Sequence, residues 1–149
     1  MEKSKINELF KKYGLTSSDY YAHKHYQIIT RQGIDKIQAK ERIFIEYDVV
    51  KCDPEFCAVK ASASKENAKI QTFGSAKYGG KINKDGKWVE IGNTTTWYLL
   101  EMAEKRAMSR AVLKLTGFYE LGVMSEDESE SFKKKTTKEE LITKIKKDV

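Results

Sequence analysis

The sequence predicts an α+β fold, in which an antiparallel sheet of about three to five strands is packed by a long C-terminal helix and by a shorter basic helix. Three observations support this prediction. No Gly or Pro interrupts residues 94 to 116, and Gly117 follows as an expected C-cap. Residues 43 to 76 hold three segments of strand composition separated by turn residues. Residues 31 to 40 repeat apolar side chains at helical spacing.

The N-terminal part is predicted to hold a helix, a strand and the basic helix. Residues 4 to 13 form a short amphipathic pattern that stops at Gly14. An aromatic-rich stretch then leads into a first strand at residues 27 to 31, and the basic helix follows over residues 31 to 40. Its inner side is expected to carry Ile34, Ile37 and Ala39. Its outer side is expected to carry Arg31, Lys36 and Lys40.

The central sheet is expected from strands at residues 43 to 50, 56 to 63 and 68 to 76. The only proline of the chain, Pro54, marks the first turn between them. Hairpin connections of this length make the strands antiparallel in the main.

Residues 77 to 92 are predicted to form a Gly- and Lys-rich hairpin with Asp85-Gly86 at its tip. Tyr78 and Trp88 are interleaved with its four lysines, which are Lys77, Lys81, Lys84 and Lys87. Ammonium groups can meet phosphates while aromatic rings stack on bases, so this composition suits a single-stranded nucleic acid. A solvated hairpin with Trp88 packed on the core explains the same composition, and the pattern leaves both interpretations open.

The long helix is predicted over residues 94 to 117, with threonines as candidate N-caps. One face is expected to pack through Trp97, Leu100, Ala107, Met108, Ala111 and Leu115. The roughly opposite face carries a cationic row of Arg106, Arg110 and Lys114, spaced four residues apart. Such a row is either a solvated face or a set of phosphate contacts. Glu104 projects into the apolar sector and needs a partner there.

The chain is long enough for one domain, and we expect residues 1 to 124 to form a single α+β DNA-binding domain. Residues 125 to 135 change from acidic to basic and are expected to be a flexible linker. Residues 136 to 149 contain a capping box at Thr137 and Glu140, so a C-terminal amphipathic helix or tail is predicted, with a possible protein partner.

Composition favours binding over catalysis. The formal charge of +6 at pH 7 favours a polyanionic partner. No nucleophile with a positioned base and no metal-ligand spacing is recognisable, so we expect no enzyme, no cofactor and no metal. A metal nuclease built on scattered acids is a minor alternative, through Glu46, Asp48, Asp53 and Glu55.

Cys52 and Cys57 are expected to be reduced thiols in a cytoplasmic protein, because neither a signal segment nor a membrane span is recognisable.

Three segments together carry a family resemblance. Residues 25 to 40, the strand pair from 56 to 76, and residues 103 to 117 with their acidic continuation resemble phage single-strand annealing proteins of the Erf and Sak types. Those proteins are similar to the ring-forming eukaryotic mediator Rad fifty-two. The resemblance implies an α+β protomer that forms homo-oligomeric rings and pairs complementary strands without nucleotide or metal. Single-stranded DNA would lie in a positively charged groove between helix and hairpin elements.

The resemblance also implies roles for particular residues. Arg106, Arg110 and Lys114 of the long helix would hold phosphates, with Arg31 and Lys36 of the basic helix beside them. Lys77, Lys81, Lys84 and Lys87 would face the strand from the hairpin, where Trp88 is the candidate stacking residue. The expected function is therefore annealing of single-stranded DNA in phage-type homologous recombination.

Two other functions fit the same sequence. The strands and aromatic residues between 43 and 90 could also support a non-annealing single-stranded DNA-binding module of the OB type. Alternatively, the acidic residues 126 to 130 could mimic DNA in a protein-interaction module that inhibits a host factor.

Overall fold

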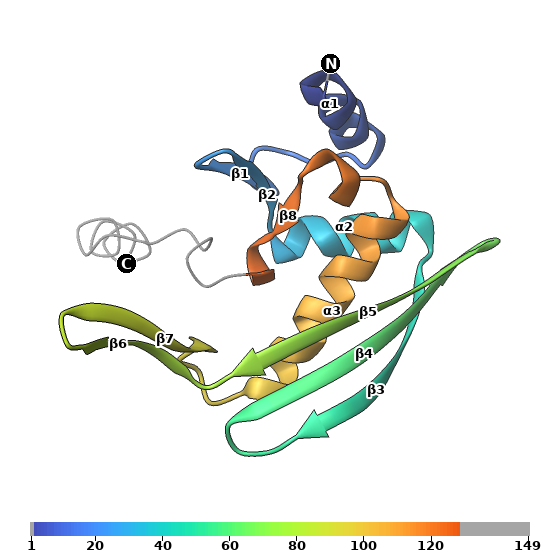
Figure 1. Ribbon diagram of the computed structural model, residues 1–149. Helices are drawn as coiled ribbons and strands as arrows, with labels where there is room; N and C mark the ends of the chain where they lie inside the picture. Colours follow the sequence, from blue (N-terminus) through green and yellow to red (C-terminus); the bar gives the residue numbers. More distant parts are fainter. Residues whose placement is uncertain (1, 129–149) are drawn as a thin grey trace, which may run out of the picture.

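The computed structural model describes residues 2 to 128, so the predicted tail at 136 to 149 and most of the predicted linker lie outside the described residues. The chain is an α+β protein, as predicted (Figure 1). In chain order, its helices and strands are α1 Glu2–Lys12, β1 Tyr20–His23, β2 Tyr26–Ile29, α2 Arg31–Glu41, β3 Phe44–Cys52, β4 Phe56–Lys65, β5 Ala68–Lys77, β6 Gly79–Lys84, β7 Lys87–Thr94, α3 Leu99–Leu115 and β8 Met124–Ser125. Two 3-10 turns, η1 Tyr119–Leu121 and η2 Glu126–Glu128, complete the fold.

The strands form three small sheets. The central sheet has the order β3-β4-β5 and is antiparallel throughout, as expected. Strands β6 and β7 form the predicted hairpin, which extends from the end of β5 (Figure 1). In the third sheet, β2 pairs with β1 antiparallel and with β8 parallel. The single predicted strand near residue 27 is therefore one half of a hairpin.

Helix α3 lies against one face of the central sheet, because small residues there allow a close approach (Figure 1). The covered face of β4 alternates Cys57, Val59, Ala61 and Ala63, all buried. Gly74 of β5 marks the tightest point, where an added Cβ would lie 2.1 Å from the Ala103 carbonyl oxygen and 2.4 Å from the Ala107 nitrogen. The Thr72 hydroxyl donates a hydrogen bond of 2.6 Å to the Ala107 carbonyl.

Two buried clusters lie along α3. The first half of the helix packs on the central sheet through Met102, Ala103 and Ala107. The second half packs with α1, α2 and the segment after α3, around Phe118. The basic helix α2 contributes Ile34 and Ile37 to this second cluster, as predicted, and is N-capped by the Thr30 hydroxyl.

Several expectations about element boundaries were wrong. Helix α3 begins at Leu99 without a side-chain cap, because Thr94 ends strand β7. Trp97 therefore precedes the helix and is 86% exposed instead of packing. Ala39 of α2 is exposed. Residues 125 to 128, which are predicted to belong to the linker, form the end of β8 and the turn η2, and η2 packs against α3.

Among the described residues, none of the helices has the length and apolar character that crossing a membrane requires.

Candidate nucleic-acid interface

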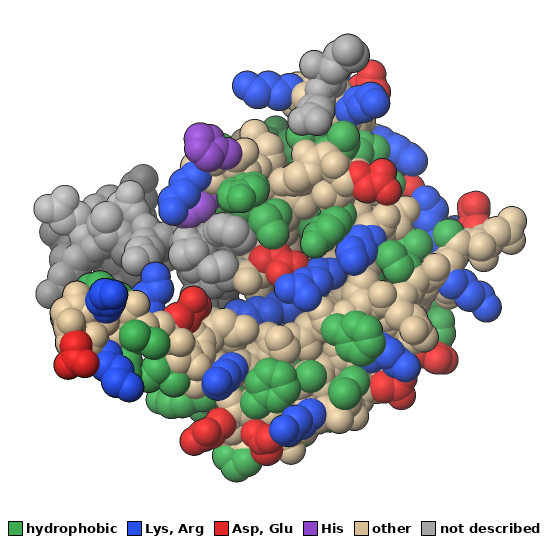
Figure 2. Space-filling view, viewed as in Figure 1, with side chains coloured by type: hydrophobic (Ala, Val, Ile, Leu, Met, Phe, Trp, Pro, Cys, Tyr) green, Lys and Arg blue, Asp and Glu red, His purple; other side chains and the backbone are tan. Residues whose placement is uncertain are grey.

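The face of the central sheet that α3 does not cover carries aromatic and basic side chains. Strand alternation and register place the acidic Glu46 and Asp48 of β3 on it, and Asp48 Oδ2 lies 3.8 Å from Lys60 Nζ. The same register places there six aromatic and basic residues, namely Phe44 of β3, Phe56 and Lys60 of β4, and Lys69, Phe73 and Lys77 of β5. We call these six residues the outer sheet face. Hydrophobic and basic side chains are interspersed over the sheet in Figure 2.

Two phenylalanines of the outer sheet face, one on each edge strand of the central sheet, present their rings to solvent. Phe44 is 63% exposed and Phe73 is 55% exposed. Lys60 is the cross-strand partner of Phe73, so a cation and a ring lie side by side. Near Phe44, the small side chains of Ser62 and Ser64 leave a shallow hollow of about 500 Å³. A planar base could enter such a space beside a ring.

The β6–β7 hairpin projects its side chains into solvent, with residues 81 to 90 all exposed. Asp85 and Gly86, the predicted tip, have φ values of 54° and 82°, as a type I′ turn requires. Trp88 is 71% exposed, so it does not pack on the core. Register and alternation place Lys81 on the same side of the hairpin as Trp88, whereas Lys84 and Lys87 share the opposite side.

Arg106 does not belong to a solvent-facing row, so that expectation was wrong. The residue is only 2% exposed. Its guanidinium donates hydrogen bonds to the backbone carbonyls of Asp127 at 2.7 Å, Ser75 at 2.8 Å and Asn93 at 3.3 Å. The close approach of α3 to β5 turns this side of the helix into an interior.

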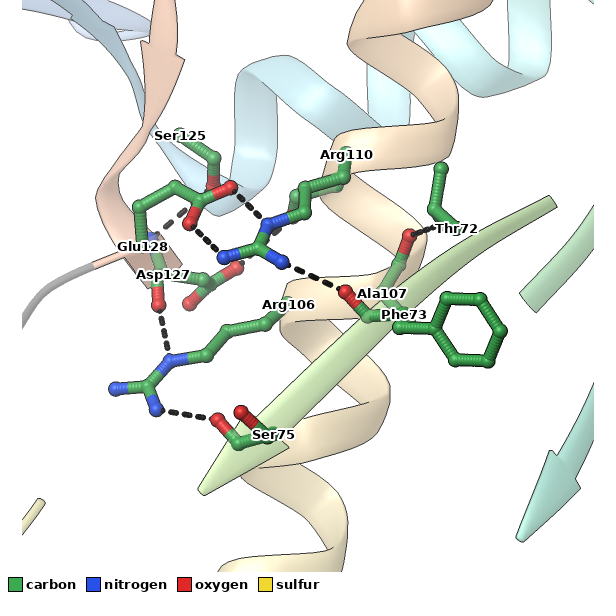
Figure 3. Close-up of polar contacts among 10 residues, drawn as sticks. Thr72, Phe73, Ser75, Arg106, Ala107, Arg110, Ser125, Asp127 and Glu128 are labelled. Atoms are coloured by element: carbon green, nitrogen blue, oxygen red, sulfur yellow. Dashed lines mark hydrogen bonds and ion pairs between the residues drawn. The ribbon is translucent and has the colours of Figure 1, made fainter. Parts of the chain in front are cut away.

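Arg110, one turn later, is partly accessible. Its side chain is 37% exposed and forms a bidentate pair with Glu128, at 2.7 and 2.8 Å. The third nitrogen donates a hydrogen bond of 2.7 Å to the Phe73 carbonyl (Figure 3). The hydrogen bonds to Glu128 raise the pKa of the guanidinium above its ordinary value, despite partial burial.

The two arginines close one edge of the central sheet. The carbonyls of Phe73 and Ser75 point outward from β5, which has no strand neighbour on this side within residues 2 to 128. Residues four apart on a helix are separated by about 6 Å and residues two apart on a strand by about 6.6 Å, so Arg106 and Arg110 match the two carbonyls. The Lys77 amide at the same edge donates a hydrogen bond to Asn93 Oδ1 at 2.8 Å.

The remaining predicted basic residues lie in separate environments. Arg31 at the start of α2 is near the same acidic turn, with Nη1 3.8 Å from Asp127 Oδ2. Lys36 forms an ion pair of 2.7 Å with Asp19, which is fully buried. Burial raises the pKa of Asp19, but hydrogen bonds from Lys36 and Thr16 outweigh it and hold that pKa below its ordinary value.

Lys114 is exposed beside the ring of Tyr119, with Nζ 5.0 Å from the ring centroid. The structure therefore brings Arg31, Arg106 and Arg110 together around η2. It leaves Lys36, Lys114 and the hairpin lysines outside that group.

The sequence reasoning missed the aromatic residues of the outer sheet face and the attachment of η2. Alternation along β5 was a usable signal for Phe73, because it shares a side with Lys69 and Lys77. No local pattern indicates that Glu128 folds back onto Arg110. Glu104, which was expected among apolar residues, is exposed. Burial raises the pKa of Tyr47 above its ordinary value, and the negative charge of Glu104 raises it further.

Within residues 2 to 128, no group of three or more His, Cys, Asp and Glu side chains is arranged to hold a metal ion. Cys52 and Cys57 are both free thiols, with their sulfur atoms 3.4 Å apart across the β3–β4 pair.

Compared with known protein families, curated proteins and solved structures, the chain matches none of them.

Proposed function

We propose that this protein binds single-stranded DNA and promotes the annealing of complementary strands, as in phage-type homologous recombination, without nucleotide or metal. The observation that carries the proposal is the set of exposed rings interspersed with lysines on the outer sheet face and the hairpin. A soluble monomer rarely exposes so many large apolar side chains without a partner. The resemblance of three segments to the Erf and Sak proteins points in the same direction.

The chemistry of the surface fits a single strand better than a duplex. Phe44, Phe73 and Trp88 offer faces for stacking, and bases are available for stacking only when they are unpaired. Lysines beside the rings would neutralise phosphates and release counterions, which gives affinity without sequence recognition. A strand held extended on an open sheet leaves base edges free to sample a complementary strand.

We further propose that the protein forms homo-oligomers through the edge of β3. That edge has no strand neighbour among the described residues, and Tyr47, Val49 and Val50 are exposed along it. Unpaired apolar edges favour strand pairing with another chain. The opposite edge is closed by Arg106 and Arg110, so β3 would pair with β3 of a second copy. Such a two-fold contact closes at a dimer, and a ring requires one more contact.

Binding can be tested by fluorescence anisotropy of a labelled oligodeoxythymidylate. Phe73→Ala is expected to weaken binding roughly tenfold, since one base stacked on an aromatic ring contributes about 1–3 kcal/mol. Tyr26→Ala is the matched control, because Tyr26 is 44% exposed but lies on the β1-β2-β8 sheet. Absence of binding at low salt, or equal losses in both variants, would contradict the proposal.

Annealing is measured separately, by the rate at which two complementary labelled strands pair. The proposed function requires that the protein accelerate this rate. A protein that protects a strand yet slows pairing would be a non-annealing binder. The strands from 44 to 94 form an open sheet and a separate hairpin, which differs from the OB-type barrel expected for such a binder.

A further inference from the structure

The turn η2 places three consecutive acidic residues against basic groups of α2 and α3. We call Glu126–Glu128 the acidic segment. The Glu126 carboxylate accepts a hydrogen bond of 2.8 Å from the backbone N–H of Arg31. The two oxygens of Glu128 accept hydrogen bonds from Arg110 at 2.7 and 2.8 Å. Asp127 accepts a hydrogen bond of 3.2 Å from the Ser109 hydroxyl.

These contacts are the ones that a phosphate group would make. An N–H at the first residue of a helix binds anions, and Arg31 is the first residue of α2. A guanidinium binds a carboxylate and a phosphate with the same bidentate geometry. Glu126 and Glu128 therefore occupy two groups whose chemistry suits phosphates of a nucleic acid.

The occupied groups border the proposed binding surface. Arg110 joins Glu128 on one side to the Phe73 carbonyl on the other, at 2.7 Å (Figure 3). The Phe73 ring belongs to the outer sheet face. Figure 2 shows basic side chains gathered in a band between the central sheet and the smaller sheet above it. A strand stacked on Phe73 would reach Arg110 with its backbone only after Glu128 had moved.

The acidic segment is anchored in a way that permits such movement. Asp127 is 4% exposed, and its carbonyl accepts a hydrogen bond from Arg106 at 2.7 Å. Ser125 is fully buried and belongs to β8. Glu126 and Glu128 flank this anchor and meet Arg31 and Arg110 through their carboxylates, and the Glu128 side chain is 7% exposed. Rotation of the two glutamates into solvent would free Arg31 and Arg110 while the backbone stays in place.

We propose that the acidic segment is an internal competitor for nucleic acid, because Glu126 and Glu128 must release Arg31 and Arg110 before phosphates can bind there. This inference rests on the proposed function. The consequence is a protein that binds single strands weakly until the two side chains turn away.

The test compares oligodeoxythymidylate binding by the full chain and by Glu126→Gln/Glu128→Gln over a range of salt concentrations. The double variant should bind roughly tenfold more tightly at low salt. Its dependence of log affinity on log salt should be steeper by about 0.7, since Arg110 is the cation that Glu128 releases and each phosphate contact of a cation on a single strand adds about 0.7. Glu8→Gln/Glu101→Gln is the control, because both residues are exposed and removal of their charges changes the net charge equally. Adding Arg110→Gln to the double variant should remove much of the gain.

The outcomes of this binding experiment distinguish failure of the internal competitor from failure of the proposed function. Equal affinity of the double variant and the control, with binding by the unchanged chain, would overturn the internal competitor and leave the proposed function standing. Absence of binding by every form would overturn both. Tighter binding by the double variant than by the unchanged chain and the control, with all three binding at low salt, would support both.

A measurement on the unchanged protein covers the case in which the variant does not fold. The carboxyl ¹³C resonances of Glu126 and Glu128 should move toward that of the exposed Glu8 when oligonucleotide is added. Resonances that stay unmoved while the oligonucleotide binds would overturn the inference.

Discussion

The arginines of α3 and the lysines of the β6–β7 hairpin carry the same charge in opposite settings. Arg106 is 2% exposed and donates to three backbone carbonyls, whereas Lys81 and Lys84 project from a hairpin whose residues 81 to 90 are all exposed. Arginine suits the first setting because its planar donors match fixed acceptors. Lysine suits the second because its charge remains hydrated and mobile.

This contrast separates structural cations from available ones. Removing Arg106 should change the free energy of unfolding, while removing hairpin lysines should change only nucleic-acid binding. The following predictions test that separation, in decreasing order of their expected effect on stability.

Arg106→Met is expected to lower the free energy of unfolding by about 4 kcal/mol. The variant leaves the carbonyls of Ser75, Asn93 and Asp127 without their charged donor, and loss of one partner from a buried polar network costs about 3–5 kcal/mol. Urea denaturation measures the change. Lys114→Met is the control, because Lys114 is exposed and its replacement should change stability by less than about 0.5 kcal/mol. Equal effects of the two would refute a structural role for Arg106.

Gly74→Ala is expected to cost about 3 kcal/mol, near the upper end for overpacking. The added Cβ would meet backbone atoms of α3 at 2.1 and 2.4 Å, so the helix must move away from β5 and strain both arginine contacts. Gly80→Ala is the matched control, since its Cβ would lie 3.5 Å from the Thr95 methyl group. Thermal unfolding of both variants gives the comparison, and a tolerated Gly74→Ala would show that the approach of α3 is not fixed.

Lowering the pH should test the contribution to stability of Glu41, a carboxylate that pairs with Lys12 and Lys65. Glu41 accepts hydrogen bonds from Tyr13 at 2.5 Å and from Lys65 at 3.0 Å, and it lies 3.3 Å from Lys12. The hydrogen bond from Tyr13 does most to lower the pKa of Glu41, and the two lysines add to it against partial burial, which brings the pKa to about 2. A lowered folded pKa stabilises the protein above the unfolded value of 4.5, and this stability is lost as pH falls toward 2.

The expected loss for Glu41 is about 2 kcal/mol, because the exposed Lys12 reduces the effect of the full pKa shift. Urea midpoints measured between about pH 5 and pH 2 report it. Glu41→Gln should be less stable near neutrality and should lose this component of the pH dependence. An unchanged pH profile in that variant would show that other carboxylates carry the acid sensitivity.

Lys84→Gln/Lys87→Gln should leave the free energy of unfolding within about 0.5 kcal/mol of the original value, since both side chains are exposed. The salt dependence of oligonucleotide binding should become shallower by about 1.4, two contacts at about 0.7 each. Lys3→Gln/Lys5→Gln on α1 removes the same charge from exposed positions elsewhere. The same loss of binding in both pairs would mean that net charge, and not the hairpin, attracts the strand.

Local pattern predicted most of the elements correctly. The alternation and turn residues of β4 and β5, the apolar repeat of α2 and the Asp85-Gly86 tip each act within a few residues, so the sequence shows them directly. The start of α3 was wrong because Thr94 is paired in β7, and strand pairing overrode its tendency to cap a helix.

The candidate site was only partly predictable. The hairpin lysines and Trp88 are exposed, as one of the two interpretations required, because a projecting hairpin has no second layer to cover it. The row on α3 divided into a buried Arg106, a paired Arg110 and an exposed Lys114. Their spacing in the sequence is identical, so no local pattern could have separated them.

The sequence by itself determined most of the segments that become helix, strand and turn, and that cations line one side of the long helix. Only the tertiary structure decided what meets that side, namely the edge of β5 and the acidic segment. The physical reason is that periodicity specifies a direction from the helix axis, whereas burial depends on residues brought there from elsewhere in the chain. Gly74 and Glu128 lie 32 and 22 residues from Arg106 along the sequence. Together with Ser75 and Asp127, they change a cationic face of the helix into an interior.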